Sequence, residues 1–218
     1  MTRIASWLHD GRITGWVALV PLIYFATEWV VSASWRGYYA YRDDRVGLLG
    51  IAFCGPEGNW PCSDLYRAMN VALLATGLAV AFVAAGFVAQ RVTGRSHAVL
   101  LLVAGLGLAC SGVITQNVDY AWNLTATASF VTLGSISVLL IAVSSTSKMS
   151  GERRGIAVFS GLVSFVGVLS FVGEQQIFGS GGAQRMAIYG ILVAVIALGA
   201  AGMRSQKVAA IELAEDVR

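Results

Sequence analysis

Long apolar stretches separated by short polar segments dominate this chain. Crossing about 30 Å of hydrocarbon takes roughly twenty apolar residues in a helix. Six windows approach that length, at about residues 15–34, 69–90, 98–115, 122–143, 156–174 and 184–203. Long unbroken apolar runs favour helices over the alternating strands of a β-barrel. The pattern therefore predicts an all-α integral membrane protein, in which residues 1–218 form one bundle of six transmembrane helices.

Composition supports the membrane assignment and removes one class of partner. The chain is 56% hydrophobic and only 12% charged, whereas about a quarter of the residues in a soluble domain are charged. Its net charge of +3 is spread thinly. No stretch combines clustered Lys and Arg with the aromatic spacing that holds single-stranded nucleic acid. Nucleic acid is therefore not expected as a partner.

Lys and Arg are distributed unevenly between the two sides of the predicted bundle. The side that holds the termini carries ten of these residues, and the opposite side carries five, which are Arg36, Arg42, Arg45, Arg67 and Arg185. Because basic residues accumulate on the cytoplasmic side, both termini are expected in the cytoplasm. The first apolar stretch is longer than a signal-peptide core and is expected to be retained. We expect the chain in the plasma membrane of a bacterium, with the loop 35–68 outside.

This outer loop contains two cysteines, Cys54 and Cys62, in the run CGPEGNWPC. In an oxidising compartment, two cysteines separated by a turn with Gly and Pro favour a disulfide that closes a small loop. Two free thiols near the membrane are the alternative. Cys110 lies within the third predicted helix and is expected to be a small packing residue.

Small residues recur along the predicted helices and favour close helix packing rather than chemistry, because close approach over small side chains is what packs helices in lipid. They are Gly105, Gly107 and Gly112, then Ser160, Ser164 and Gly167, and finally Gly199 and Gly202.

Three carboxylates, Glu28, Asp119 and Glu174, fall within predicted helices or at their ends. Ionisable groups inside a membrane are costly, so each is a candidate functional residue. All three lie toward the outer leaflet. At 100° per residue, Glu28 shares a helix face with Tyr24 and Phe25, so aromatic rings are expected around this carboxyl group.

A carboxyl group among apolar rings favours its protonated form and can act as a general acid. Aromatic faces can stabilise a carbocation that such protonation creates. This combination is what a membrane-bound, acid-initiated terpene cyclase requires, an isomerase that protonates an alkene or epoxide of a prenylated substrate and guides ring closure, and the resemblance given below makes it the leading hypothesis. Glu28, Glu174 and Asp119 would be its catalytic residues. The expected substrate-binding residues are Tyr24, Phe25, Trp29, Trp122, Phe171 and Arg185.

Each of these residues also has a structural interpretation. Asp119 and Glu174 lie close enough to the interface to be ordinary solvated helix-end residues. Trp29 and Trp122 can be members of an interfacial aromatic belt. Glu28 can form a buried structural ion pair with Arg67 or Arg185.

Several kinds of cofactor chemistry are not supported by the sequence. The two histidines, His9 and His97, lie near the cytoplasmic ends of their segments, and no Cys/His cluster has zinc spacing. There is no phosphate-binding loop or dinucleotide fingerprint. The pair Asp43-Asp44 lacks the third carboxylate of an aspartate-rich motif for magnesium diphosphate. We therefore expect neither a cofactor nor a metal.

Three segments carry a resemblance to a known family: WRGYYAYRDDRVGLLG after the first helix, CSDLYRAMNVALLATG entering the second, and GSGGAQRMAIYGILVAVIALGA at the last. On these segments the chain resembles the six-helix membrane family described as domain of unknown function 998. The resemblance implies the six-helix fold and assigns no functional residue.

In size, helix content and placement of buried acids, the chain is also similar to small membrane-bound terpene cyclases of bacterial meroterpenoid pathways. In those enzymes membrane carboxylates act as proton donors, which implies a hydrophobic prenylated small molecule or a lipid as partner. The alternative function is a non-enzymatic lipid-binding or transport-related membrane protein, and a structural subunit of a larger complex is a third possibility.

Overall fold

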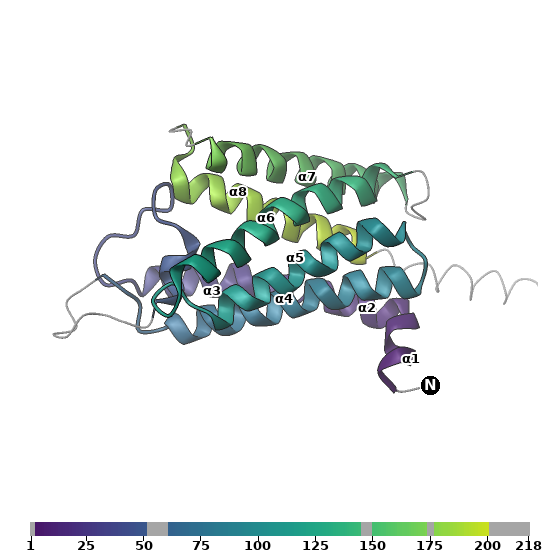
Figure 1. Cartoon of the computed structure of the whole chain (residues 1–218), viewed down its shortest axis with the longest axis horizontal. Coiled ribbons are helices and arrows are strands. Elements are labelled where there is room, and N and C mark those ends of the chain that lie inside the picture. The colour runs from purple at the N-terminus through teal and green to yellow at the C-terminus, as the bar shows by residue number, and fades with distance from the viewer. Residues whose placement is uncertain (1–2, 52–60, 145–149, 174–176, 201–218) are drawn as a thin grey trace, which may run out of the picture.

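The computed structural model describes residues 3–51, 61–144, 150–173 and 177–200. All regular elements in these ranges are helices (Figure 1). They are α1 (Arg3–His9), α2 (Gly11–Val17), α3 (Pro21–Ala33), the 3-10 helix η1 (Val46–Gly50), α4 (Tyr66–Ala89), α5 (Arg95–Val113), α6 (Tyr120–Val143), α7 (Gly151–Val172) and α8 (Gly179–Gly199).

The described residues include six helical spans that are long and apolar enough to cross a membrane. Five are α4 to α8, and the first combines α2 and α3 over Gly11–Ala33. The predicted all-α class with six membrane spans is therefore confirmed.

The first span differs from the single helix predicted over residues 15–34. The chain turns at residues 18–20, and α3 starts at Pro21. Proline has no backbone N–H and cannot donate to the preceding turn, but at the first position of a helix that donor is not needed. The last span begins at Gly179 instead of residue 184, because its first turn is built from small polar residues that an apolar window leaves out.

Consecutive spans pack side by side, so that α3 lies against α4, α4 against α5, and so on to α7 against α8. The bundle is closed by α2, which contacts both α4 and α8. At this contact the end of α8 meets the first span, where a Cβ added to Gly199 would lie 2.2 Å from the Cβ of Ala18. The first span therefore starts at the end of the bundle where the last span finishes (Figure 1).

Glycines allow the backbones of neighbouring helices to approach closely. A Cβ added to Gly105 in α5 would lie 2.6 Å from the backbone nitrogen of Ala81 in α4. A Cβ added to Gly167 in α7 would lie 2.5 Å from the backbone nitrogen of Ala187 in α8. The structural role predicted for these two glycines is confirmed.

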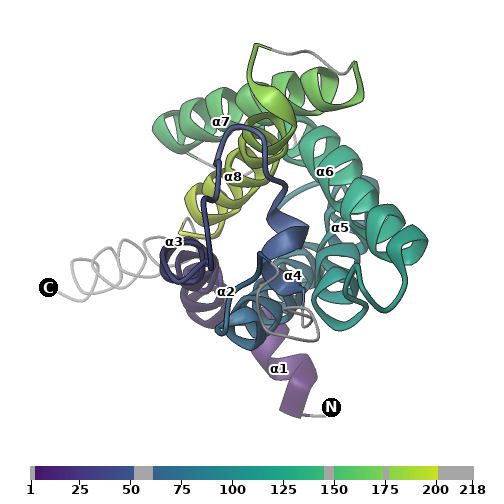
Figure 2. The ribbon, with the colours of Figure 1, turned by 90° about the vertical axis from the view of Figure 1, so that its left-hand side faces the viewer.

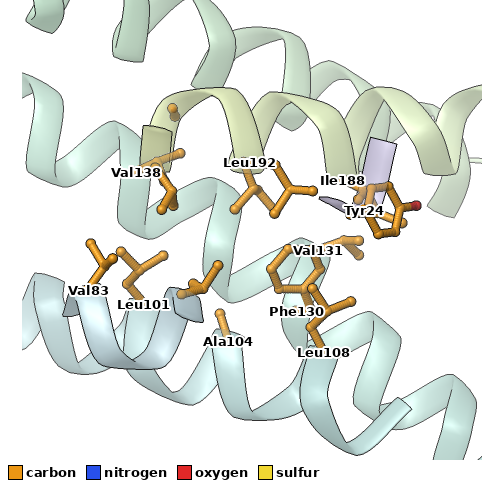
Figure 3. Close-up of a cluster of buried hydrophobic side chains, with 14 of the residues drawn as sticks. Tyr24, Val83, Leu101, Ala104, Leu108, Phe130, Val131, Val138, Ile188 and Leu192 are labelled. Carbon is orange, nitrogen blue, oxygen red and sulfur yellow. The ribbon is translucent and has the colours of Figure 1, made fainter. Parts of the chain in front are cut away.

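The middle of the bundle is filled by apolar side chains from α4, α5, α6 and α8 (Figure 3). Leu101, Phe130 and Leu192 are fully buried there. This apolar core lies between the two ends of the bundle, and a buried hydrogen bond between the hydroxyls of Ser135 and Ser164 at 2.6 Å joins α6 to α7 beside it.

The segment that joins α3 to α4 crosses one end of the bundle, where its first part and η1 lie over α4 and α8 (Figure 2). Its two ends are held together by an antiparallel bridge between Trp35 and Ser63 and by an ion pair from Arg36 to Asp64 at 2.6 Å. We call the part from residue 36 to residue 50 the end loop. Cys62 is buried and disulfide-bonded. Its predicted partner Cys54 lies outside the described residues, so the pairing stays a prediction.

Replacing Gly105 by Ala should lower the free energy of unfolding by about 1–3 kcal/mol, because the new methyl group meets the backbone of α4 rather than a flexible side chain. Gly155 in α7 is the matched control, since a Cβ added there has no neighbour within 4 Å. Thermal unfolding in detergent micelles measures both variants. Equal melting temperatures for the two variants would contradict the packing role.

Candidate functional site

Glu28 lies on the buried face of α3. Pro21, Tyr24 and Ser32 are buried on the same helix, and only 1% of Glu28 is exposed. The face predicted from helical periodicity is therefore observed, and the carboxylate points into the bundle.

Both carboxylate oxygens of Glu28 accept hydrogen bonds from α8. Nε of Arg185 donates to Oε1 at 2.7 Å, and the hydroxyl of Tyr189 donates to Oε2 at 2.8 Å. The partners are four residues apart on α8, so they lie on one face of that helix. Of the two arginines considered as structural partners, Arg185 is the one that pairs with Glu28.

The remaining donors of Arg185 bind the end loop. One terminal nitrogen donates to the backbone oxygens of Tyr41 and Asp44, each at 2.7 Å, and the other donates to the hydroxyl of Tyr39. The guanidinium carbon lies 4.7 Å from the ring centre of Tyr41 and 5.3 Å from that of Tyr39. Arg185 therefore joins α3, α8 and the end loop through one side chain.

Tyr39 is held as a neutral phenol within this cluster. Burial raises the pKa of its hydroxyl, and this effect exceeds the opposite effect of the Arg185 charge. The phenol accepts from Arg185 and lies 3.3 Å from the backbone oxygen of Arg45, to which it can donate. It therefore extends the contact of Arg185 toward the start of η1.

Glycines at the start of α8 let the end loop approach Arg185. A Cβ added to Gly181 would lie 2.3 Å from the backbone oxygen of Asp44, the same oxygen that accepts from Arg185. Gly182 donates its backbone N–H to the oxygen of Arg42 at 2.8 Å. The backbone φ of Gly179 is +68°, a conformation that residues with a Cβ rarely adopt. The run GSGG thus allows the Arg42 carbonyl to accept from one of the free N–H groups at this helix end.

The chemistry open to Glu28 follows from these contacts. The rings of Tyr24 and Phe25 pack edge to face at 5.7 Å, and Phe25 packs on Tyr189 at 5.1 Å, so the expected aromatic surroundings are present. To act as a proton donor, Glu28 would have to be protonated and in contact with its substrate. Instead, its carboxylate faces a guanidinium and a phenol. A role as general acid would require Arg185 and Tyr189 to release the carboxylate first.

The other residues of the hypothetical cyclase site are spread over the outer parts of the molecule. Asp119 is the N-cap of α6, where Oδ1 accepts from the backbone N–H of Trp122 at 3.0 Å. Trp29 and Trp122 are 70% and 64% exposed, so they face away from Glu28. Phe171 lies under the guanidinium of Arg45 at 5.2 Å. Glu174 lies outside the described residues.

A separate polar pocket lies beside the charged cluster, between η1 and helices α4, α5, α6 and α8. Its inner wall is apolar and continues into the core through Leu73, Leu108 and Ile188. Its polar lining consists of amides and hydroxyls only: Asn70, Ser111, Thr115, Asn123, Thr127 and Gln184. We call this the amide pocket.

Two amides of the pocket hold η1 in place. Gln184 accepts at Oε1 from the backbone N–H of Val46 at 2.9 Å, and Nδ2 of Asn70 donates to the oxygen of Gly50 at 3.0 Å. Oδ1 of Asn70 is buried and has no hydrogen-bond partner. The cavity has about 10 Å³ for water-sized groups, which is about the space that one water-sized group needs.

Sequence reasoning identified Glu28 and Arg185 but missed much of what surrounds them. Tyr189 carries a usable signal, because its spacing of four from Arg185 puts both side chains on one face of α8. Gln184 and Ile188 have the same spacing and form the neighbouring face, which lines the amide pocket. Tyr39 carries no such signal, because its contact with α8 depends on the path of the end loop.

The described residues contain no group of three or more His, Cys, Asp or Glu side chains that could hold a metal ion. Comparison of the chain with protein-family models, curated proteins and solved structures gives no match. The two family resemblances stay predictions.

Removing either member of the Glu28–Arg185 pair should lower the free energy of unfolding by about 3–5 kcal/mol, because the partner charge stays buried. The double variant Glu28→Gln with Arg185→Met should cost less than the sum of the single changes by about 1–3 kcal/mol. Thermal and denaturant unfolding in micelles measure this double-mutant cycle.

The exposed pair of Arg36 and Asp64 is the matched control, since 43% and 65% of these side chains are accessible. Its coupling should be about 0–1 kcal/mol. A coupling for the buried pair as small as that of the control would show that the buried contact does not hold the bundle together.

Proposed function

We propose that this protein is a non-enzymatic, lipid-binding membrane protein that receives the polar group of an amphipathic molecule in the amide pocket. The single observation that carries the proposal is that neighbouring residues of α8 make different kinds of contact. Arg185 and Tyr189 are used to hold Glu28, whereas the adjacent Gln184 lines a pocket. The charged groups of Glu28 and Arg185 are thus occupied by structural contacts, and the uncharged carboxamide of Gln184 faces the cavity.

The lining of the amide pocket supports binding rather than acid–base chemistry. Amides and hydroxyls do not change protonation state near neutral pH, so none of them can serve as an acid or base in turnover. They recognise a ligand by hydrogen bonds, next to an apolar wall. A small number of fixed polar groups in an apolar pocket is typical of ligand sites.

The core of the bundle favours binding over transport in this conformation. Leu101, Phe130 and Leu192 are fully buried between the amide pocket and the opposite end. Nearby, the buried hydroxyls of Ser135 and Ser164 bind each other at 2.6 Å and also bind backbone oxygens, so they do not extend the amide pocket.

We further propose that the amide pocket lies at the outer face of the plasma membrane and that both termini are cytoplasmic. The excess of Lys and Arg on the side of the termini supports this orientation. A reporter enzyme that works only in the cytoplasm should be active when it is fused at the C-terminus. Activity of a periplasm-specific reporter at that position would reverse the orientation.

Native mass spectrometry of the protein purified from its membranes tests the binding function. The wild type should carry a bound small molecule, and Thr127→Leu should lose it, because the larger side chain fills the amide pocket. Thr125→Leu is the matched control, since Thr125 is exposed on the same helix, where its hydroxyl binds its own backbone at Ala121. Equal occupancy in both variants would contradict binding in the pocket.

A second assay separates binding from the terpene cyclase hypothesis. Membranes that contain the protein are incubated with farnesylated aromatic compounds and their epoxides, and products are analysed by chromatography and mass spectrometry. We expect no isomer of unchanged mass. An isomer that forms with the wild type and disappears in a folded Glu28→Gln variant would overturn the non-enzymatic proposal in favour of the cyclase.

A further inference from the structure

We propose that a groove between α5 and α6 binds an anionic phospholipid, with its phosphate among basic side chains and an acyl chain along α6. The groove lies at the end of the bundle that holds α1, so the inference does not rest on the amide pocket at the opposite end. Three observations carry it: the size and openness of the groove, its level along the spans, and the positive charge around it.

The groove lies where α5 begins and α6 ends, at the same end of the bundle as α1 (Figure 1). It is lined by one residue of α5 and by the last turn and C-cap of α6, which are His97, Leu139, Leu140, Val143 and Ser144. Its volume is about 400 Å³, within the range of sites for organic ligands. Leu140 and Val143 are 40% and 63% exposed, so the groove is open to the surroundings of the bundle.

The groove crosses the level at which the apolar spans end. Val143 is the last residue of α6, and His97 lies in the first turn of α5. In a bilayer, this is the level where hydrocarbon meets headgroups. Leu139 and Leu140 then lie on the hydrocarbon side, where they can contact an acyl chain. Nδ1 of His97 is buried, which leaves Nε2 as the nitrogen that can face the groove and donate to a phosphate oxygen.

Arg154 of α7 brings a guanidinium to the rim of the groove. Its Nε donates to the backbone oxygen of Ala142 at 2.9 Å, and one terminal nitrogen donates to that of Val143 at 3.2 Å. These bonds satisfy carbonyls at the negative end of the α6 dipole. The other terminal nitrogen has no hydrogen bond to the described residues, so it is available to a phosphate oxygen, a group that guanidinium binds strongly.

Positive charge surrounds this end of the bundle. Four arginines lie beside the start of α5 or at the start of α7: Arg91, Arg95, Arg153 and Arg154. Among the described residues, none of them forms an ion pair with a carboxylate. Such a cluster attracts anionic lipids, because each basic side chain near the membrane surface adds to the attraction. A free phosphate would leave the apolar side of the groove uncovered, so the favoured ligand carries both a negative headgroup and an acyl chain.

Phosphatidylglycerol and phosphatidylcholine with the same acyl chains test the proposal. Each is titrated into the purified full-length protein in uncharged micelles at pH 7, and the melting temperature is followed. Phosphatidylglycerol should raise it saturably, whereas phosphatidylcholine and glycerol phosphate, which has no acyl chain, should not. Equal effects of the two phospholipids would overturn the proposal, and so would an equal effect of glycerol phosphate, which would indicate a site for a free anion.

Val143→Glu tests the location of the site. The added carboxylate lies in the groove and offers Arg154 a competing anion, so the apparent affinity for phosphatidylglycerol should fall about fivefold, the contribution of one charge near the membrane surface. Val113→Glu is the matched control and should keep the affinity of the wild type. Val113 is the last residue of α5, at the opposite end of the bundle, and is also 63% exposed.

Arg154→Gln should cause a similar loss, whereas Arg67→Gln at the opposite end should cause none. If Arg154→Gln folds poorly because the end of α6 loses its donor, the comparison of Val143→Glu with Val113→Glu decides alone. Equal affinities of these two variants for phosphatidylglycerol would place the lipid elsewhere and show the proposal to be wrong.

Discussion

The buried ion pair between Glu28 and Arg185 is the interaction on which one end of the bundle depends. A guanidinium and a carboxylate are expensive to remove from water, and the cost is offset only when their remaining hydrogen-bonding positions are filled. Here Tyr189 donates to the second carboxylate oxygen, and two loop carbonyls and the Tyr39 hydroxyl accept from the terminal nitrogens of the guanidinium. The pair thus requires the end loop to adopt one path, and that path sets the position of η1.

The amide pocket is a consequence of this arrangement. Arg185 fixes Asp44, and Gln184 fixes Val46 two residues further along the chain. The two contacts come from consecutive residues of one helix, so α8 positions the start of η1 over the pocket, while Asn70 of α4 holds its end at Gly50. Glycines at the start of α8 make the close approach possible, because a side chain at Gly181 would occupy the space of the Asp44 carbonyl.

The sequence predicts those parts of this architecture that depend on local periodicity. Spans follow from apolar length, and the inward face of Glu28 follows from 100° per residue. The pairing with Arg185 was one of two structural alternatives, because Arg67 lies on the same side of the bundle and sequence cannot rank the two. The contact of Val46 with Gln184 joins residues 138 positions apart, and no local pattern encodes it. Helix boundaries are harder to predict from the sequence. Pro21 is an example, since a proline can either start a helix or bend one that continues through it.

The arrangement of α8 makes the rotation of this helix about its axis a determinant of the charge that lines the amide pocket. Gln184 and Arg185 project about 100° apart around the helix axis, one toward the cavity and the other toward Glu28. A turn of the helix by a single residue would exchange a carboxamide for a guanidinium at the cavity wall and leave a carboxylate facing an amide. The glycine-rich start of α8, where the Gly182 N–H binds the Arg42 carbonyl, therefore fixes the rotation of the helix about its axis. The electrostatic character of the cavity is defined by how the helix is rotated, as much as by which residues it contains.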